Sequence, residues 1–162
     1  MAIKLTKTPI LGSYVLQPEK LIDNRGYFVK TFEKTLFTEF GIKFQLREQY
    51  YSLSTMNVLR GLHFQVPPHD HSKLVYCVSG CVLDAILDIR VKSPTFGKSF
   101  TVELSDKNAL CLYVPSGLAH GFFVKSKDAL MIYNVSTEYS SKNDKGIRWD
   151  TAGIEWPHLK PI

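Results

Sequence analysis

The sequence predicts an all-β fold of the sandwich or barrel type. Short runs rich in Val, Ile, Leu, Phe and Tyr recur at roughly 8–12 residue spacing, and Gly, Pro, Ser, Asn and Asp separate them. One run, residues 82–90, also alternates its side chains as a strand does. The predicted strands are residues 14–21, 45–53, 72–79, 82–90, 98–104, 110–114, 119–124 and 129–137.

Turn signals set the boundaries of these strands. Ser79-Gly80 separates the third from the fourth, and Ser126-Lys127-Asp128 separates the last two. A single helix is predicted over residues 33–40, because Leu36, Phe37 and Phe40 share one side and Gly41 provides a stop. No repeat or linker divides the chain, so residues 1–162 are expected to form one domain.

The strand predicted over 82–90 has two different faces. Leu83, Ala85, Leu87 and Ile89 share one face, and Asp84, Ile86, Asp88 and Arg90 share the other. A face with two carboxylates and an arginine either meets solvent or lines a polar cavity. Both interpretations remain open at this point, and small barrels and jelly rolls often place a ligand inside.

Composition excludes several functional classes. Hydrophobic residues make up 44% of the chain, which excludes disorder, and no apolar run approaches the length of a membrane span. The first residues lack the hydrophobic core of a signal peptide. Cys77, Cys81 and Cys111 are expected to be buried thiols in a reducing cytoplasm. The net charge of +5 is scattered rather than clustered, which argues against nucleic acid and suits an anionic small molecule.

Four segments carry groups capable of acid–base chemistry. In Val58-Leu59-Arg60-Gly61-Leu62-His63-Phe64-Gln65, strand alternation places Arg60 and His63 on opposite faces unless a bulge intervenes. His69 and His71 share a face if their segment is extended, and Lys73 follows two residues after His71. A Pro-x-Gly turn at Pro115-Ser116-Gly117 delivers His120 to the start of a strand. The last segment contains Tyr133, with Tyr139 six residues on.

The Pro-x-Gly-x-x-His element resembles the second motif of cupins, and the ordered set of motifs resembles one cupin branch, the dTDP-4-dehydrorhamnose 3,5-epimerase (RmlC-like) family. The resemblance runs in family order over nearly the whole chain. The matching pieces are Asp23-Asn24-Arg25-Gly26-Tyr27-Phe28, Val58 to Gln65, Lys73-Leu74-Val75, Gly80, Asp84, Asp88-Ile89-Arg90, Ser93-Pro94-Thr95-Phe96-Gly97, Gly117-Leu118-Ala119-His120-Gly121-Phe122, Tyr133, Tyr139 and Trp156-Pro157.

This resemblance implies a double-sheet jelly roll (cupin) with one or two short helices. It implies a cytoplasmic, cofactor-independent isomerase that epimerises C3 and C5, or C3 alone, of a nucleotide-linked 4-keto-6-deoxy sugar for surface polysaccharide. It also implies a homodimer that exchanges N-terminal strands, so that residues 1–30 complete the neighbour's site. No partnership with a membrane or nucleic acid is implied.

The same resemblance assigns roles to individual residues. His63 matches the base, Tyr133 the acid on the other side of the sugar, Lys73 the cation beside the ketone, and Asp84 a carboxylate near it. Arg25, Arg60 and His120 match positions that hold the diphosphate, and Tyr139 matches an aromatic platform. The remaining expected substrate-binding residues are Lys30, Glu48, Tyr50 and His71.

Three departures from the family pattern keep alternatives open. Where the family has a Gln-x-Asn pair, this chain has Glu48-Gln49-Tyr50, and where the family has a Glu, this chain has Lys30. A nucleotide base other than thymine is therefore compatible with the sequence. His71 stands where many relatives carry Gln. The family aspartate that pairs with the base lies in a Ser-x-x-Asp segment after Trp-Pro, which does not follow Trp156-Pro157 here. This difference is compatible with a truncated chain, with another carboxylate in place of the aspartate, or with a reduced or altered activity.

Two other classes of function are compatible with the residues. A metal-dependent cupin would use His69, His71 and His120. However, Val75 and Tyr76 occupy the positions where such cupins usually have a carboxylate ligand, and the charge of Lys73 would repel a cation. A non-catalytic sugar-binding cupin is the third class, favoured by the missing aspartate.

Overall fold

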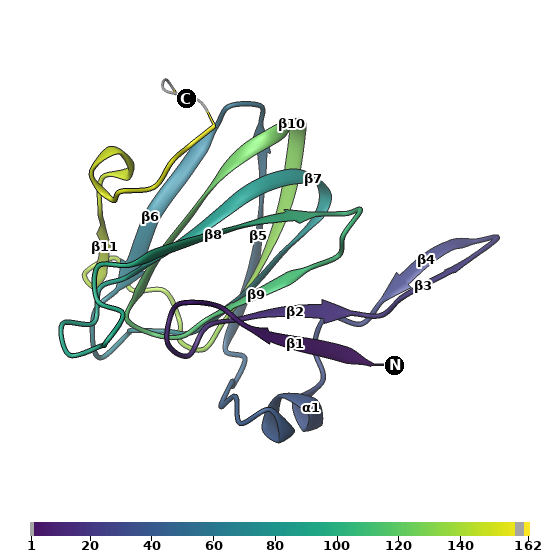
Figure 1. Ribbon diagram of the computed structural model, residues 1–162, viewed down its shortest axis with the longest axis horizontal. Helices are drawn as coiled ribbons and strands as arrows, with labels where there is room; N and C mark the ends of the chain where they lie inside the picture. Colours follow the sequence, from purple (N-terminus) through teal and green to yellow (C-terminus); the bar gives the residue numbers. More distant parts are fainter. Residues whose placement is uncertain (1, 158–160) are drawn as a thin grey trace.

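Two long strands, β7 and β10, lie side by side through the whole fold and belong to both of its layers (Figure 1). The computed structural model describes residues 2–157 and 161–162. The first part of β7 pairs with β9 and its second part with β8, whereas the first part of β10 pairs with β6 and its second part with β5. This arrangement is the expected double-sheet jelly roll. The central strands are β5 (Glu48–Thr55), β6 (Leu59–Gln65), β7 (Lys73–Asp88), β8 (Ser99–Ser105), β9 (Cys111–Val114) and β10 (Leu118–Val135).

The remaining elements extend or cover these layers. The β1-β2 hairpin adds to β9, and β11 adds to β6 at the other edge of the sheet. A separate hairpin, β3-β4, projects away from the body of the molecule (Figure 1). These elements are β1 (Ile3–Lys7), β2 (Tyr14–Pro18), β3 (Lys20–Asp23), β4 (Gly26–Val29), α1 (Lys34–Glu39), β11 (Asp144–Gly146) and the 3-10 turn η1 (Trp149–Thr151).

The predicted breaks in the two long strands were wrong. Most of residues 72–79 and 82–90 form the single strand β7, and 119–124 and most of 129–137 form β10. The turn signals mark register shifts, where the strands pass between layers. Gly80 is needed there, because a Cβ at this position would lie 2.1 Å from the carbonyl oxygen of Asp128. The predicted strands also omit β1, β4, β6 and β11. The predicted range 14–21 joins β2 through Glu19 to the first half of β3.

The apolar side chains between the layers form the main core, and Asp84 and Asp88 share this interior. Both carboxylates are fully buried, on the same face of β7 as Ile86. The polar face of this strand therefore points inward, which decides against the solvent-facing interpretation. The largest fully buried members of the core are Ile10, Val75, Val82, Ile86, Leu104, Leu112, Phe122 and Met131.

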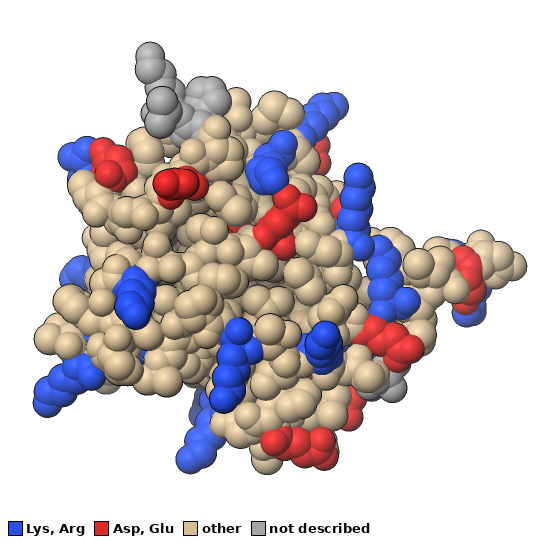
Figure 2. Space-filling view, viewed as in Figure 1, with Lys and Arg blue, Asp and Glu red and all other residues tan. Residues whose placement is uncertain are grey.

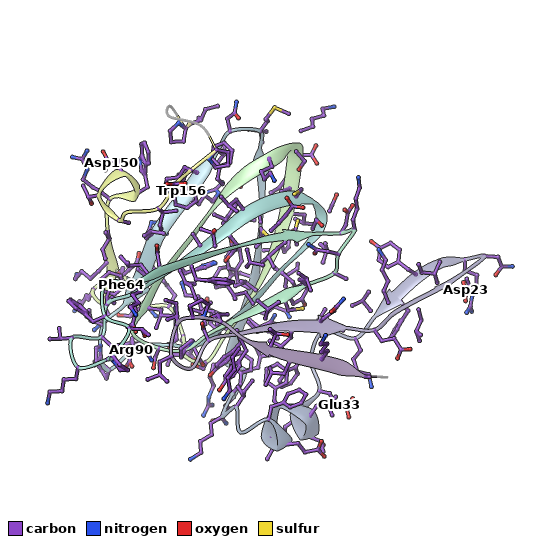
Figure 3. The ribbon with its side chains drawn as sticks, in the orientation of Figure 1. Asp23, Glu33, Phe64, Arg90, Asp150 and Trp156 are labelled. Atoms are coloured by element: carbon purple, nitrogen blue, oxygen red, sulfur yellow. The ribbon has the colours of Figure 1, made fainter. Side chains whose placement is uncertain are left out.

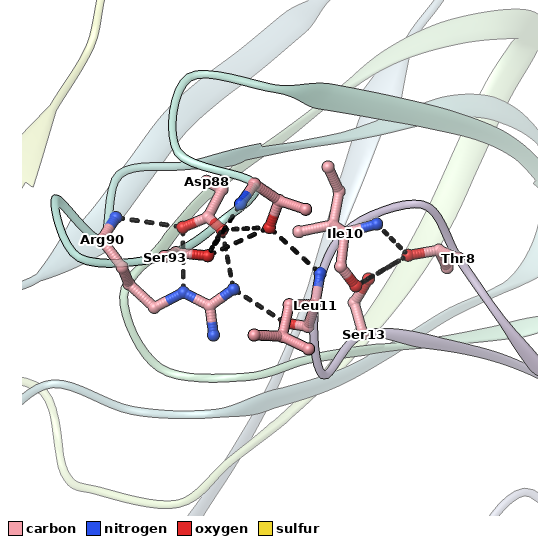
Figure 4. Close-up of polar contacts among 8 residues, drawn as sticks. Thr8, Ile10, Leu11, Ser13, Asp88, Arg90 and Ser93 are labelled. Carbon is pink, nitrogen blue, oxygen red and sulfur yellow. Dashed lines mark hydrogen bonds and ion pairs between the residues drawn. The ribbon is translucent and has the colours of Figure 1, made fainter.

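Asp88 holds the turn that follows β7 and, through Arg90, the loop between β1 and β2 (Figure 4). It accepts hydrogen bonds from Arg90 Nε at 2.9 Å, Ser93 Oγ at 2.6 Å and Thr95 Oγ1 at 2.6 Å. Burial alone would raise the pKa of Asp88, but these donors more than offset it and hold the pKa below its usual range. Arg90 Nη2 also donates to the carbonyl of Leu11, and its stem lies where a Cβ at Gly117 would stand.

The helix and the cysteines largely follow expectation. α1 buries Phe37, and Gly41 follows it with a φ of +73°, the conformation that favours glycine at a helix end. Cys77 and Cys111 are buried free thiols, whereas Cys81 is only partly buried.

The surface in Figure 2 shows Lys and Arg interspersed with Asp and Glu, without a large patch of one sign on that face. No helix in residues 2–157 and 161–162 is long and apolar enough to cross a membrane.

Candidate active site

A cavity of about 390 Å³ collects nine of the twelve site residues expected from the sequence. Strands β5, β6, β7, β10 and β11 and the segment between β10 and β11 contribute to its wall. The nine are Glu48, Tyr50, Arg60, His63, His71, Lys73, His120, Tyr133 and Tyr139.

A bulge in β6 places Arg60 and His63 in the same cavity. His63 lies opposite His120 and Arg60 lies opposite Phe122, so Gly61 and Leu62 together face the single residue Gly121. The extra residue reverses the alternation and brings both side chains to one face. Close approach makes this local structure specific for glycine, since a Cβ at Gly61 would lie 2.5 Å from the Cα of Gly121.

His63 stands at the exposed side of the cavity. Reduced hydration of the imidazolium by the cavity walls lowers its pKa, and the charges of Lys73, His120 and Arg60 act in the same direction. Asp144 opposes them by favouring the protonated ring. The imidazole is therefore neutral at neutral pH, as a general base requires.

Lys73 is a buried ammonium at the cavity wall. Burial lowers its pKa to about 8, although the charges of Asp84 and Asp144 oppose this change. Its Nζ donates to the main-chain carbonyl of His63 at 3.4 Å. Lys73 thus supplies a positive charge close to His63, in surroundings where little water screens it.

Tyr133 is buried with its phenol held in place. Its Oη lies 3.1 Å from Ser52 Oγ, and its ring stacks on Tyr50 with centroids 4.9 Å apart and planes at 19°. Both partners come from β5, which pairs with β10 so that Tyr50 lies directly opposite Tyr133. Burial raises the pKa of Tyr133, so the phenol keeps its proton and is available as a donor.

Asp84 lies behind the cavity wall rather than on it. Its two carboxylate oxygens are each 3.0 Å from Nε2 of His120, which does line the cavity. Burial raises the pKa of Asp84, and His120 and Lys73 oppose that change. Asp84 therefore reaches the cavity only through its charge and through His120, without direct exposure to it.

The remaining cavity residues are held by specific contacts. Arg60 Nε donates to Ser54 Oγ at 2.8 Å, and Glu48 accepts from the backbone N–H of Tyr139 at 2.9 Å. Nδ1 of His71 lies 3.1 Å from Gln65 Nε2, which can only donate, so Nδ1 acts as the acceptor. Burial, with the charges of Lys73 and His120, lowers the pKa of His71 to about 4 and keeps it neutral.

Arg25 and Lys30 lie outside the cavity of their own chain. Arg25 is at the tip of the β3-β4 hairpin and pairs with Asp23, whereas Lys30 pairs with Glu33 at 3.1 Å. Figure 3 shows Asp23 and Phe64, a residue of the cavity wall, at opposite ends of the molecule. One chain by itself does not bring these two cations to the site.

Sequence reasoning missed three polar residues of the cavity: Ser52, Gln65 and Asp144. Strand alternation offered a signal for two of them, because Ser52 is two residues from Tyr50 and Gln65 is two residues from His63. Asp144 had no such signal, since β11 is a three-residue strand whose position depends on its pairing with β6.

The histidines proposed for a metal do not converge in the part of the chain that the structure describes. No group of three or more His, Cys, Asp or Glu side chains there is arranged to hold an ion. His120 is paired with Asp84, and His71 is held by Gln65.

Comparison with known proteins decides the family. The sequence model described as dTDP-4-dehydrorhamnose 3,5-epimerase matches residues 7–162. The chain belongs to this family. The dTDP-4-dehydrorhamnose 3,5-epimerase of Shigella flexneri is 40% identical over 163 residues, which cover 99% of this chain and 90% of that protein. The chain is accordingly an isomerase of the carbohydrate epimerase class.

Two solved structures of epimerases show the same fold. The first is the dTDP-6-deoxy-D-glucose-3,5-epimerase of Legionella pneumophila in complex with dTDP-4-keto-L-rhamnose. It has a TM-score of 0.94 and 32% identity, covering 99% of this chain and 87% of that one. The second is a 3′-monoepimerase from Streptomyces bikiniensis in complex with dTDP-quinovose. It has a TM-score of 0.89 and 28% identity, and the match covers 96% of this chain and 80% of that one.

Proposed function

We propose that residues 1–162 form one catalytic domain that epimerises C3 and C5 of a dTDP-linked 4-keto-6-deoxy sugar without a cofactor. The observation that carries this proposal is that a neutral imidazole, a protonated phenol and a buried ammonium line one cavity. These are the base, the acid and the enolate-stabilising charge that the reaction needs.

The chemistry follows from the ketone at C4 of the sugar. Hydrogens on the neighbouring carbons are acidic because the resulting negative charge spreads onto the C4 oxygen. His63 takes the proton from one face, and the ammonium of Lys73 stabilises the enolate oxygen. Tyr133 gives a proton to the same carbon from the other face. Since the substrate's own ketone stabilises the charge, the scheme requires no cofactor.

The other polar residues of the cavity would bind the nucleotide diphosphate. The Arg60 guanidinium suits phosphate oxygens, and Tyr139, with 62% of its surface exposed, offers a flat face to the sugar or base. The relatives that act on dTDP-sugars support thymidine as the nucleoside. Glu48, Tyr50 and His71 also line the cavity and would contact the substrate there.

The proposed assembly is a homodimer in which the N-terminal segment of each subunit reaches the other subunit's site. The β3-β4 hairpin supports it, because the apolar side chains of Ile22 and Phe28 are 74% and 57% exposed. Arg25 and Lys30 would then act on the partner's substrate. We further place the enzyme in the cytoplasm, in the synthesis of activated sugars for surface polysaccharide.

Solvent exchange tests the proposed reaction. The protein in D2O is given dTDP-4-keto-6-deoxyglucose, and NMR follows deuterium entering C3 and C5. Wild-type protein should exchange both positions, and His63→Asn should exchange neither while it keeps its circular dichroism spectrum. Undiminished exchange in His63→Asn would remove the base assignment. Tight ligand binding by the wild type without exchange would identify a sugar-binding protein instead.

Epimerisation at C3 alone is the second candidate, and the similarity to the 3′-monoepimerase favours testing it. The same NMR experiment separates the two, because a C3 epimerase exchanges C3 and leaves C5 protonated. Repeating it with the GDP-linked sugar tests the choice of nucleotide. Faster exchange with the GDP-linked compound would contradict the dTDP assignment.

A further inference from the structure

The base of the proposed reaction faces three cationic or ionisable groups. Lys73, His120 and Arg60 each disfavour the protonated form of His63. When His63 removes a proton from the sugar it becomes an imidazolium, and this charge must be tolerated for the reaction to proceed. A carboxylate nearby would stabilise the imidazolium. The cavity has two carboxylates among the described residues, Glu48 and Asp144.

Of these two, Glu48 is engaged elsewhere. Its Oε2 accepts the backbone N–H of Tyr139 at 2.9 Å, which fixes the carboxylate toward the segment after β10. The third carboxylate of the region, Asp84, is fully buried behind the wall and held by His120. Asp144 accepts no side-chain hydrogen bond from another described residue, and it is the group that favours protonation of His63.

The pairing of β11 with β6 sets the position of Asp144. Gly146 lies directly opposite His63, and Asp144 lies opposite Gln65. Asp144 is therefore the diagonal neighbour of His63 on the same face of the sheet, within the reach of an aromatic ring such as that of His63. Gly146 leaves one side of the imidazole uncovered, since a Cβ there would contact Cδ2 of His63 at 3.7 Å.

The backbone around Asp144 is held in place. Its N–H donates to the carbonyl of Ser140 at 3.0 Å, and the neighbouring Asn143 donates through Nδ2 to the carbonyl of Val66 at 3.2 Å. Val66 directly follows β6, so the turn that carries Asp144 is fastened to the strand that carries His63. A carboxylate mounted in this way keeps a constant position relative to the imidazole.

We infer that Asp144 is a positioning residue for His63, whose carboxylate stabilises the imidazolium formed when His63 takes the substrate proton. The proton passes from the sugar carbon to a ring nitrogen of His63 and stays there; Asp144 remains ionised and supplies only its negative charge. This inference rests on the proposed function for its catalytic meaning, but the effect of the Asp144 charge on His63 can be measured in the substrate-free protein.

The test compares Asp144→Asn and Asp144→Ser with Asp144→Glu, which keeps the charge. Asp150→Asn is the matched control, because it makes the same change of charge on the exposed turn that follows β11. Two measurements are made on each variant. The first is the NMR titration of the His63 imidazole in the absence of substrate, assigned with His63→Asn. The second is the pH profile of kcat/KM for epimerisation.

The variants without the charge should titrate His63 at a lower pH than the wild type, and the acidic limb of kcat/KM should move the same way. The plateau value of kcat/KM should fall on the order of tenfold in these variants, which is a fraction of what a general base contributes. Asp144→Glu should recover most of the loss, and Asp150→Asn should match the wild type. An unchanged His63 titration in both uncharged variants would overturn the inference. A shifted titration in a protein that never exchanges substrate protons would keep the pairing and reject the proposed function.

Discussion

Nε2 of His120 lies 3.0 Å from both carboxylate oxygens of Asp84, and neither side chain reaches bulk solvent. A buried carboxylate is costly unless it is paired and hydrogen-bonded. The pair is thus part of what stabilises the wall of the cavity, and it also fixes the ring of His120 where substrate phosphate is expected.

Removal of the Asp84 carboxylate should therefore destabilise the fold. Asp84→Ala leaves a buried imidazole without its partner, and we expect it to lower the free energy of unfolding by about 3 kcal/mol. Urea denaturation measures this change. Glu103→Ala, which breaks the exposed pair with Lys125, is the control and should cost less than about 1 kcal/mol. Equal losses in the two variants would contradict a structural role for the buried pair.

The pH profile of kcat/KM should be bell-shaped. His63 must be neutral, and its pKa lies below its ordinary value of 6.5, so activity falls as the pH drops through that lower value. Lys73 must be charged, and its pKa is about 8, so activity falls again as the pH rises through about 8. Lys73→Arg keeps its charge at high pH and should lose the alkaline limb. If Lys73→Arg shows the same alkaline limb as the wild type, the limb belongs to a group other than Lys73.

Tyr133→Phe should separate proton removal from proton return. His63 still removes the proton and solvent exchange continues, but inverted product should form about 100-fold more slowly because its donor is gone. Ser52→Ala should give a smaller loss, since it removes only the 3.1 Å contact to the phenol. Tyr51→Phe, on the same strand with its side chain 70% exposed, should leave both rates unchanged. NMR of the deuterated products distinguishes exchange from inversion.

Gly61→Ala should disrupt the bulge that brings Arg60 and His63 together. The new Cβ would lie 2.5 Å from Gly121 Cα and 2.8 Å from the carbonyl of His120, so the two strands must separate. We expect a loss of about 2 kcal/mol or more in stability, with a loss of activity. Gly97→Ala is the control, because Gly97 also has a positive φ but has open space for a Cβ. Thermal unfolding and kcat/KM measure the difference, and similar losses in both would point to backbone strain alone.

Local pattern was sufficient for much of the fold. Apolar runs and turn residues located most of the long strands, and Leu36, Phe37 and Phe40 located the helix. The same signals misplaced the breaks in β7 and β10, because Ser79-Gly80 and Ser126-Lys127-Asp128 look alike in sequence whether they form a turn or lie at a strand crossing. Gly80 is excluded from carrying a side chain by Asp128, a residue 48 positions away.

By itself, the sequence determined which chemical groups this protein has and the family order in which they occur, including His63, Lys73, His120 and Tyr133. Only the tertiary structure decided how they work together. Whether Arg60 joins His63 depended on a bulge opposite Gly121, and whether Asp84 was solvated depended on which face of β7 was covered. The charge beside His63 came from Asp144, on a strand too short to predict. These are contacts between distant segments, and local periodicity carries no information about them.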